Sequence, residues 1–144
     1  MTSYQIHHLN FLKIAYNNFI NRQPFTDEEI VEDDVDFINE FKQLIELYES
    51  SPASAYELGA DFIDKAFRKY PQLAHLIARD LLWFFGGNNL HNLTDDEINK
   101  FQQLDELRFA AEAQDQDFDY INTRASLFGQ NQGAFVSSYE ITRM

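Results

Sequence analysis

The stretch PQLAHLIARDLLWFFGG, residues 71–87, decides the fold. Its apolar side chains would surround most of a helix over residues 71–85, and a helix that is apolar on nearly all sides is usually central in its domain. Pro71 suits the first turn, where its missing N–H is not needed. Gly86 and Gly87 are suitable residues for the C-terminal end. The stretch therefore predicts a central helix at about 71–85.

The segments on both sides of this stretch repeat apolar residues every three or four positions, which is the spacing of one helix face. This pattern predicts amphipathic helices at about 4–21, 27–49, 53–69, 95–114 and 118–128. No segment alternates with a period of two, as a half-buried strand would. We therefore predict an all-α fold, a compact single-domain bundle of five or six helices around the central helix.

Helix boundaries follow from local chemistry. Thr26, Ser54 and Thr94 each precede a glutamate by three residues, which is the capping-box pattern of a helix start. Asp117 offers a cap for the last helix. Gly59 falls on the apolar face of 53–69 and would let another helix approach closely.

The chain of 144 residues is suited to one domain. We place the helical domain at 1–128. The remaining residues, 129–144, lose the helical pattern. We expect them to form a polar C-terminal tail, either mobile or docked through Phe135 and Tyr139.

The composition excludes several classes of protein. The chain has 24 acidic and 11 basic side chains and a net charge of -13, which disfavours direct binding to nucleic acid or to an anionic membrane. It has no cysteine, so disulfides, thiolate metal sites and a cysteine nucleophile are absent. No apolar run has the length of a membrane span, and the N-terminus lacks a secretory signal pattern. We expect a cytoplasmic protein.

The negative charge is concentrated in residues 26–50 and 95–120. A helix over 27–49 would place several acids beyond its first turn, where the helix dipole does not explain them. One interpretation is a solvated face that keeps the protein in solution. The other is a docking surface for a basic protein, for which the candidate residues are Glu29, Glu32, Asp33, Asp34 and Asp36.

Arg79 and Asp80 interrupt the most apolar segment of the chain, and buried charges need partners. The structural interpretation is that each lies at an edge of the central helix and tethers a neighbouring helix. The functional interpretation is a polar pocket formed by Arg79, Asp80, Trp83, Asn88 and His91.

The sequence offers no recognisable catalytic or metal motif, so we expect no catalytic residues, no metal and no cofactor. Glu-x-x-His pairs, HExxH, a Gly-x-Ser-x-Gly elbow and a P-loop do not occur. His7 and His8 are adjacent, so on a helix they would point about 100° apart and would not easily share a metal.

One region has a distinctive set of segments, Arg79–Gly87, Leu90-His91, Asp96–Ile98 and Phe101–Glu106. Together these segments resemble a family of small uncharacterised proteobacterial proteins. Members of that family carry an acidic residue and a cysteine after the double glycine, where this chain has Asn88 and Asn89. The resemblance implies a bacterial cytoplasmic protein and no particular activity.

These observations favour a non-catalytic protein that binds a basic protein partner as a regulator, adaptor or immunity-type inhibitor. The first alternative is a nucleic-acid mimic that competes for a DNA-binding protein, which would require the two acidic helices to lie side by side. The second alternative is a small-ligand binder or enzyme that uses residues 79–97. The sequence leaves the oligomeric state open.

Overall fold

Residues 1–129, which the computed structural model describes, consist of six α-helices, short 3-10 helices labelled η, and the loops between them. In chain order the elements are α1 (Ser3–Ile20), α2 (Glu32–Ser50), η1 (Pro52–Ser54), α3 (Ala55–Lys69), η2 (Pro71–Leu76), α4 (Arg79–Phe85), η3 (Gly87–Asn92), α5 (Asp95–Ala113) and α6 (Tyr120–Phe128). Within these residues there is no strand. The prediction of an all-α single domain is confirmed.

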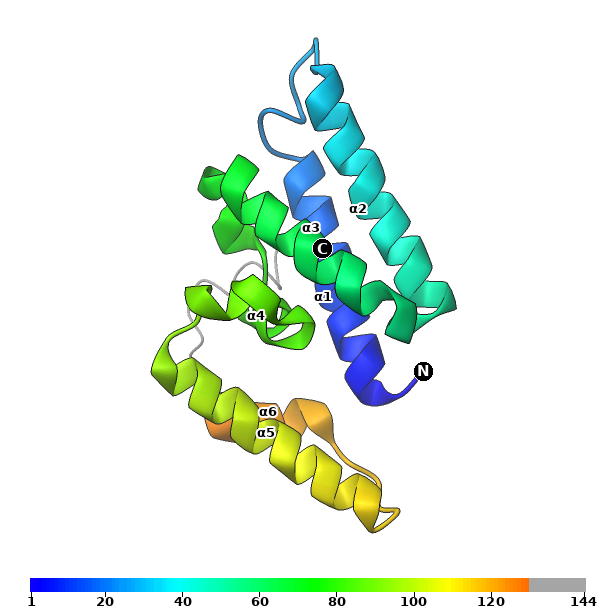
Figure 1. Cartoon of the computed structure of the whole chain (residues 1–144), viewed down its shortest axis with the longest axis vertical. Coiled ribbons are helices and arrows are strands. Elements are labelled where there is room, and N and C mark those ends of the chain that lie inside the picture. Colours follow the sequence, from blue (N-terminus) through cyan, green and yellow to red (C-terminus); the bar gives the residue numbers. More distant parts are fainter. Residues whose placement is uncertain (130–144) are drawn as a thin grey trace.

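The helices form two groups that meet at α4 (Figure 1). In the first group α1 and α2 run side by side, and α3 crosses them. In the second group α5 and α6 pair with each other as a hairpin that extends away from α1–α3. We call this hairpin, residues 95–128, the α5–α6 arm. It contacts the rest of the molecule through α4 and the N-terminal part of α1.

The core is built largely from the faces that the spacing predicts. On α2 the apolar residues at this spacing, Phe37, Phe41, Leu44 and Tyr48, are all buried. Phe37 stacks on Phe62 of α3 with ring centroids 4.7 Å apart. Aromatic side chains thus join α2 to α3, and burying one such ring contributes roughly 1.5–3 kcal/mol to stability.

The predicted central helix is wrong as a continuous element. It is divided into η2 and the seven-residue α4, with Ile77 and Ala78 extended between them. Both linking residues are buried, so the break keeps apolar surface in the core while it gives α4 its own N-terminus. Tertiary packing here outweighs the helix propensity of the segment. A central position predicts that residues 76–85 are the most buried part of the stretch, and most of them are buried, although Trp83 is only partly buried.

The predicted start of α2 is also wrong. Thr26 does not cap it, because the helix begins at Glu32 with Val31 at the N-cap position. Glu32, Asp33 and Asp34 therefore lie in the first turn. There the helix dipole favours acidic side chains by about 0.3–1 kcal/mol each, so most of this charge has a local structural explanation.

The last helix presents a different face from the predicted one. The spacing of Phe118, Ile121, Ala125 and Phe128 predicts that all four face the core, but the side chain of Ile121 is 59% exposed. The buried residues of α6 are Tyr120, Arg124 and Phe128, spaced four apart. The helix is capped by Asp119 instead of Asp117. The capping box at Thr94 is confirmed, whereas Ser54 forms no cap hydrogen bond.

Gly59 provides the close approach that its position suggested. A Cβ at this residue would lie 2.2 Å from Cε1 of Phe85, so the ring of α4 occupies the space that a side chain would need. The C-terminal stop of α4 is likewise confirmed, since Gly86 has a φ of 65°. The predicted tail falls almost entirely outside the described residues, as do Phe135 and Tyr139. None of the helices described is both long and apolar enough to span a membrane.

Candidate functional site

Polar side chains from three distant parts of the sequence meet where the α5–α6 arm joins the rest of the molecule. They come from the first turns of α1, from α4 and from α6. We call this set the Asp80 cluster, and its members are Tyr4, His7, His8, Asp80, Tyr120 and Arg124.

Asp80 is the centre of the cluster and has no exposed surface. Arg124 donates two hydrogen bonds to it, from Nε to Oδ2 and from Nη2 to Oδ1, each 2.7 Å long. His7 Nε2 lies 3.0 Å from Oδ2. Burial alone would raise the pKa of the Asp80 carboxyl. The hydrogen bonds from His7 and Arg124 and the positive charge of Arg124 outweigh the effect of burial and hold that pKa well below its usual range. Asp80 is therefore ionised, and it links α1, α4 and α6.

His8 lies beside this pair and is also completely buried. Its Nδ1 is 2.7 Å from the carbonyl oxygen of Tyr4, which accepts a hydrogen bond from it. Its ring stacks on Phe84 at a centroid distance of 4.3 Å. Burial, together with the neighbouring His7, lowers the pKa of His8 to about 3, so the imidazole is neutral at physiological pH.

Two buried polar atoms of the cluster have no hydrogen-bond partner among the described residues: Nε2 of His8 and the hydroxyl of Tyr120. Burial and the nearby Asp80 raise the pKa of Tyr120, so its hydroxyl keeps its proton. A buried polar group without a partner costs roughly 1–3 kcal/mol, and such groups in a native fold often mark a bound water, an ion or a functional role.

A second polar group continues the cluster along the arm. Trp83 Nε1 donates to Asp105 Oδ2 at 2.8 Å, and the Trp83 ring stacks parallel to that of Phe101. Arg108 lies 3.5 Å from the other Asp105 oxygen and 3.8 Å above the Tyr4 ring. Polar contacts thus fasten α5 to both α4 and α1.

Of the five residues of the predicted pocket, three bind different partners and two are exposed. Arg79 donates to both Glu97 oxygens, each at 2.8 Å, whereas Asp80 binds Arg124 and His7. Trp83 binds Asp105, and the remaining two predicted residues, Asn88 and His91, are exposed. Arg79 and Asp80 therefore act as tethers between helices, in line with the structural interpretation of this pair.

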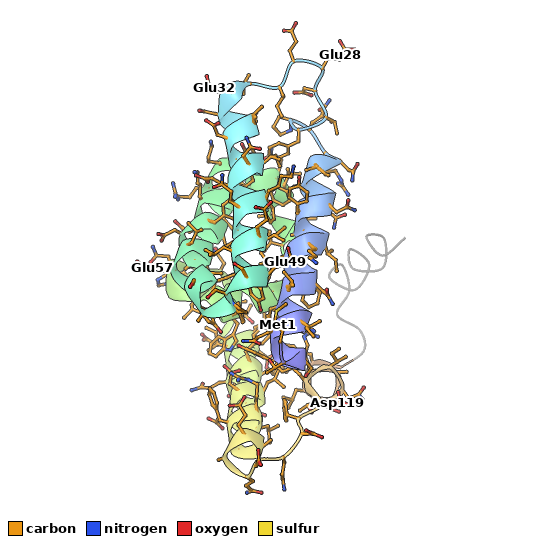
Figure 2. The ribbon with its side chains drawn as sticks, turned by 90° about the vertical axis from the view of Figure 1, so that its right-hand side faces the viewer. Met1, Glu28, Glu32, Glu49, Glu57 and Asp119 are labelled. Carbon is orange, nitrogen blue, oxygen red and sulfur yellow. The ribbon has the colours of Figure 1, made fainter. Side chains whose placement is uncertain are left out.

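The predicted partner-binding acids lie at the end of the molecule where α2 begins, close to Glu28 and Glu32 (Figure 2). Glu29, Glu32, Asp33 and Asp36 are exposed and form no ion pair within residues 1–129. Asp34 instead accepts a short hydrogen bond from the Tyr70 hydroxyl, which gives it a structural role.

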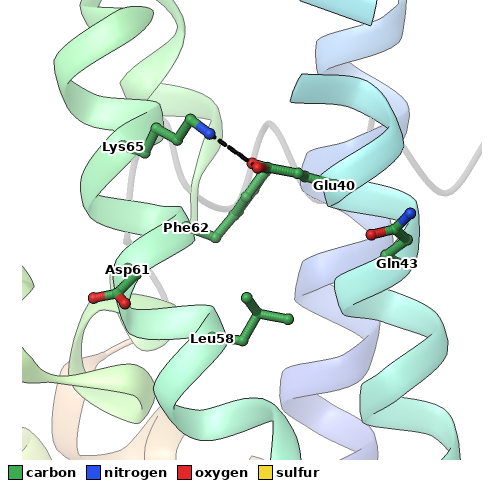
Figure 3. A pocket seen from close by; sticks show the side chains of 6 residues that line it. All are labelled: Glu40, Gln43, Leu58, Asp61, Phe62 and Lys65. Atoms are coloured by element: carbon green, nitrogen blue, oxygen red, sulfur yellow. Dashed lines mark hydrogen bonds and ion pairs between the residues drawn. The ribbon is translucent and has the colours of Figure 1, made fainter. Parts of the chain in front are cut away.

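A groove of about 220 Å³ lies between α2 and α3 (Figure 3). Leu58, 48% exposed, and the edge of Phe62 provide its apolar surface. Glu40 crosses it and forms an ion pair with Lys65 at 2.8 Å. On α2 the acids Asp33, Asp36 and Glu40 are spaced three and four apart, so they form one stripe that leads into this groove. We call it the α2 stripe.

The two acidic helices do not lie side by side. Figure 1 places α2 within the first group of helices and α5 in the arm, on the other side of α4. The arrangement that nucleic-acid mimicry would require is therefore not present.

Most of the Asp80 cluster was not predicted from the sequence, although the sequence holds signals for two of its residues. His8 continues the buried spacing of Leu12, Ala15 and Phe19, and Arg124 falls midway between the buried Tyr120 and Phe128. His7 and His8 were expected to point apart. In the structure they nevertheless come together with Asp80: one ligand atom from each of the three residues lies within 4.8 Å of the other two.

Comparison with known proteins gives one match. A protein-family model described as PA2817-like matches residues 1–135. No curated protein and no solved structure matches the chain. The Asp80 cluster, the α2 stripe and the groove all lie within the matched region.

Proposed function

The chain belongs to the PA2817-like family, and we propose that it is a non-catalytic protein that binds a basic protein partner as a regulator, adaptor or immunity-type inhibitor. The observation that carries this proposal is the α2 stripe and the apolar groove into which it leads. Within this stripe Asp33 and Asp36 form no ion pair among the described residues, so they would attract a positively charged partner, and the exposed Leu58 would give it an apolar contact.

The first turn of α2 accounts for part of the acidity, so the proposal depends on the acids that the helix dipole does not need. Asp36 lies beyond that turn, and Glu29 precedes the helix. Both are exposed. The partner that best fits this surface has basic residues opposite the α2 stripe and one apolar side chain for the groove.

A pair of charge-matched variants tests this proposal. Glu29→Gln with Asp36→Asn neutralises the two acids that the helix dipole does not need, and Glu106→Gln with Asp117→Asn removes the same charge from exposed positions on and after α5. Affinity capture from native lysate at low and high salt should lose basic partners with the first variant and keep them with the second. Equal losses in both variants would mean that only total charge matters.

A photo-crosslinking residue at position 58 gives a second test, because Leu58 lines the groove and is exposed. We expect a crosslinked basic protein from position 58 and a weaker yield of it from position 121, an exposed apolar position on α6. The proposal fails if position 58 crosslinks nothing that was captured at low salt.

A further inference from the structure

We propose that His7, His8 and Asp80 together bind one divalent first-row metal ion, of which Zn²⁺ fits best. The ligand atoms of these three residues lie within 4.8 Å of one another. Two imidazoles and a carboxylate are a ligand set that Zn²⁺ uses with a fourth position left for water.

His8 is already arranged as a metal ligand. Its Nδ1 donates to the Tyr4 carbonyl, which fixes the tautomer and leaves a lone pair on Nε2. That Nε2 is buried and has no partner among the described residues. Histidines that bind metals commonly donate their other ring N–H to a carbonyl or a carboxylate in this way.

His7 and Asp80 have nearly the spacing that a shared metal requires. Two ligand atoms, each about 2.1 Å from a tetrahedral Zn²⁺, lie roughly 3–3.5 Å apart. His7 Nε2 and Asp80 Oδ2 are 3.0 Å apart. The proton that His7 Nε2 shares with Asp80 would have to move to Nδ1, the other tautomer, before Nε2 could bind the ion. His7 retains 10% exposure of its side chain, which gives the ion a route from solvent.

Arg124 sets an upper limit on the affinity. Its guanidinium holds both Asp80 oxygens and would repel a second cation. A carboxylate offers about four acceptor positions, and Arg124 uses one on each oxygen of Asp80. If His7 Nε2 binds the ion, its hydrogen bond to Oδ2 is given up, and that position on Oδ2 becomes open to the metal. Mg²⁺ and Ca²⁺ prefer sites built mainly from oxygen, and this set offers one carboxylate, so the site discriminates against both.

The chain provides matched controls, since it has four histidines and two of them, His75 and His91, are exposed. The tag-free protein is stripped with a chelator and titrated with Zn²⁺ at about pH 7.5 against a chromophoric chelator. We expect one Zn²⁺ per chain in the parent protein and in the double variant His75→Gln with His91→Gln. His7→Gln and His8→Gln should each bind more than about tenfold more weakly, because each loses a ligand.

Co²⁺ provides a spectroscopic readout that depends on the geometry of the site, and circular dichroism confirms that each variant folds. The visible absorption of bound Co²⁺ should change in His7→Gln. The His7 side chain is partly exposed, so His7→Gln disturbs the fold less than His8→Gln and serves as the test if His8→Gln does not fold. The proposal is overturned if the parent protein binds no Zn²⁺ at one equivalent, or if only the exposed histidines affect binding.

Discussion

Asp80 has no exposed surface, and it is ionised only because Arg124 and His7 surround its carboxylate with donors. An ion pair in such a place adds little net stability compared with apolar residues of similar volume, but breaking it leaves a buried charge unpaired. The sequence indicated that Asp80 needs a partner. It did not identify Arg124, which is 44 residues away and becomes a neighbour only through the docking of the α5–α6 arm.

The effects of removing Asp80 and Arg124 should therefore not be additive. Asp80→Asn should lower the free energy of unfolding by about 3–5 kcal/mol, since the Arg124 charge stays buried. The double variant Asp80→Leu with Arg124→Met should lose less than the sum of Asp80→Leu and Arg124→Met measured alone, with a coupling of about 0.5–3 kcal/mol. Urea unfolding in chelator-containing buffer measures each value, and strict additivity would contradict the pairing.

Glu97 should contribute to stability in a pH-dependent way. The hydrogen bond from Arg79 lowers the pKa of Glu97 despite partial burial. Its contribution is therefore full above the unfolded-state pKa, about 4.3, and is lost as pH falls through the lower folded-state pKa. Glu97→Gln keeps a side-chain acceptor for the capping box with Thr94 but loses the ion pair.

The stability difference between the parent protein and Glu97→Gln should be largest at neutral pH and should shrink below about pH 4. Glu106→Gln, at an exposed position on the same helix, is the control and should show a small difference at all pH values. Chemical unfolding at several pH values measures both. A difference that grows on acidification would mean that the Glu97 pKa is not lowered in the folded state.

At the scale of the elements, helix faces were more predictable than helix ends. The apolar spacing of α2 identified its buried face, because a face depends on residues three and four apart in the sequence. The start of α2 was misplaced because a capping box at Thr26 is a local signal, and nothing local revealed that the chain forms turns and bends over 21–29 before Val31 takes the N-cap position. The break between η2 and α4 is of the same kind, since α4 packs on α1, which is far away in the sequence, as well as on α3.

The contact between α3 and α4 yields an element-scale prediction. Gly59→Ala adds a Cβ that would lie 2.2 Å from the Phe85 ring, so the helices must separate or the ring must turn. We expect a net loss of about 1–3 kcal/mol in the free energy of unfolding, although alanine favours a helix more than glycine does.

Phe85→Leu introduced with Gly59→Ala should recover part of this loss, because leucine is smaller than the ring that obstructs the new methyl group. Asp61→Ala, at an exposed position on the same helix, is the control for helix propensity. Thermal and urea unfolding measure the effects. If Gly59→Ala is stabilising, the close contact between α3 and α4 does not limit this position.

At the scale of the whole molecule, the charge of -13 means that the folded chain repels itself. The sequence established this charge and its concentration in two regions. It could not establish that α2 and α5 lie on opposite sides of α4, because that placement depends on how the arm docks. The same long-range docking created the Asp80 cluster, which is why that site was largely unpredicted.

Added salt should stabilise the protein. Raising NaCl from about 10 to 300 mM shortens the Debye length from roughly 30 Å to below 10 Å and screens the repulsion among acids. The surface ion pairs weakened by the same salt contribute about 0–1 kcal/mol each. We expect Tm to rise with salt, and to rise less in Asp33→Asn with Asp36→Asn. A Tm that falls would mean that ion pairs dominate the electrostatic energy.

The hydrogen bond between Trp83 and Asp105 has an optical consequence, because Trp83 is the single tryptophan of the chain and lies at the contact between α4 and the arm. Its fluorescence responds to the water and charges at that contact, whereas far-ultraviolet circular dichroism averages over every helix. If the arm detaches before the rest of the molecule unfolds, the emission of Trp83 will shift at a lower denaturant concentration than the loss of ellipticity. Coincident curves would mean that both groups of helices unfold as one cooperative unit.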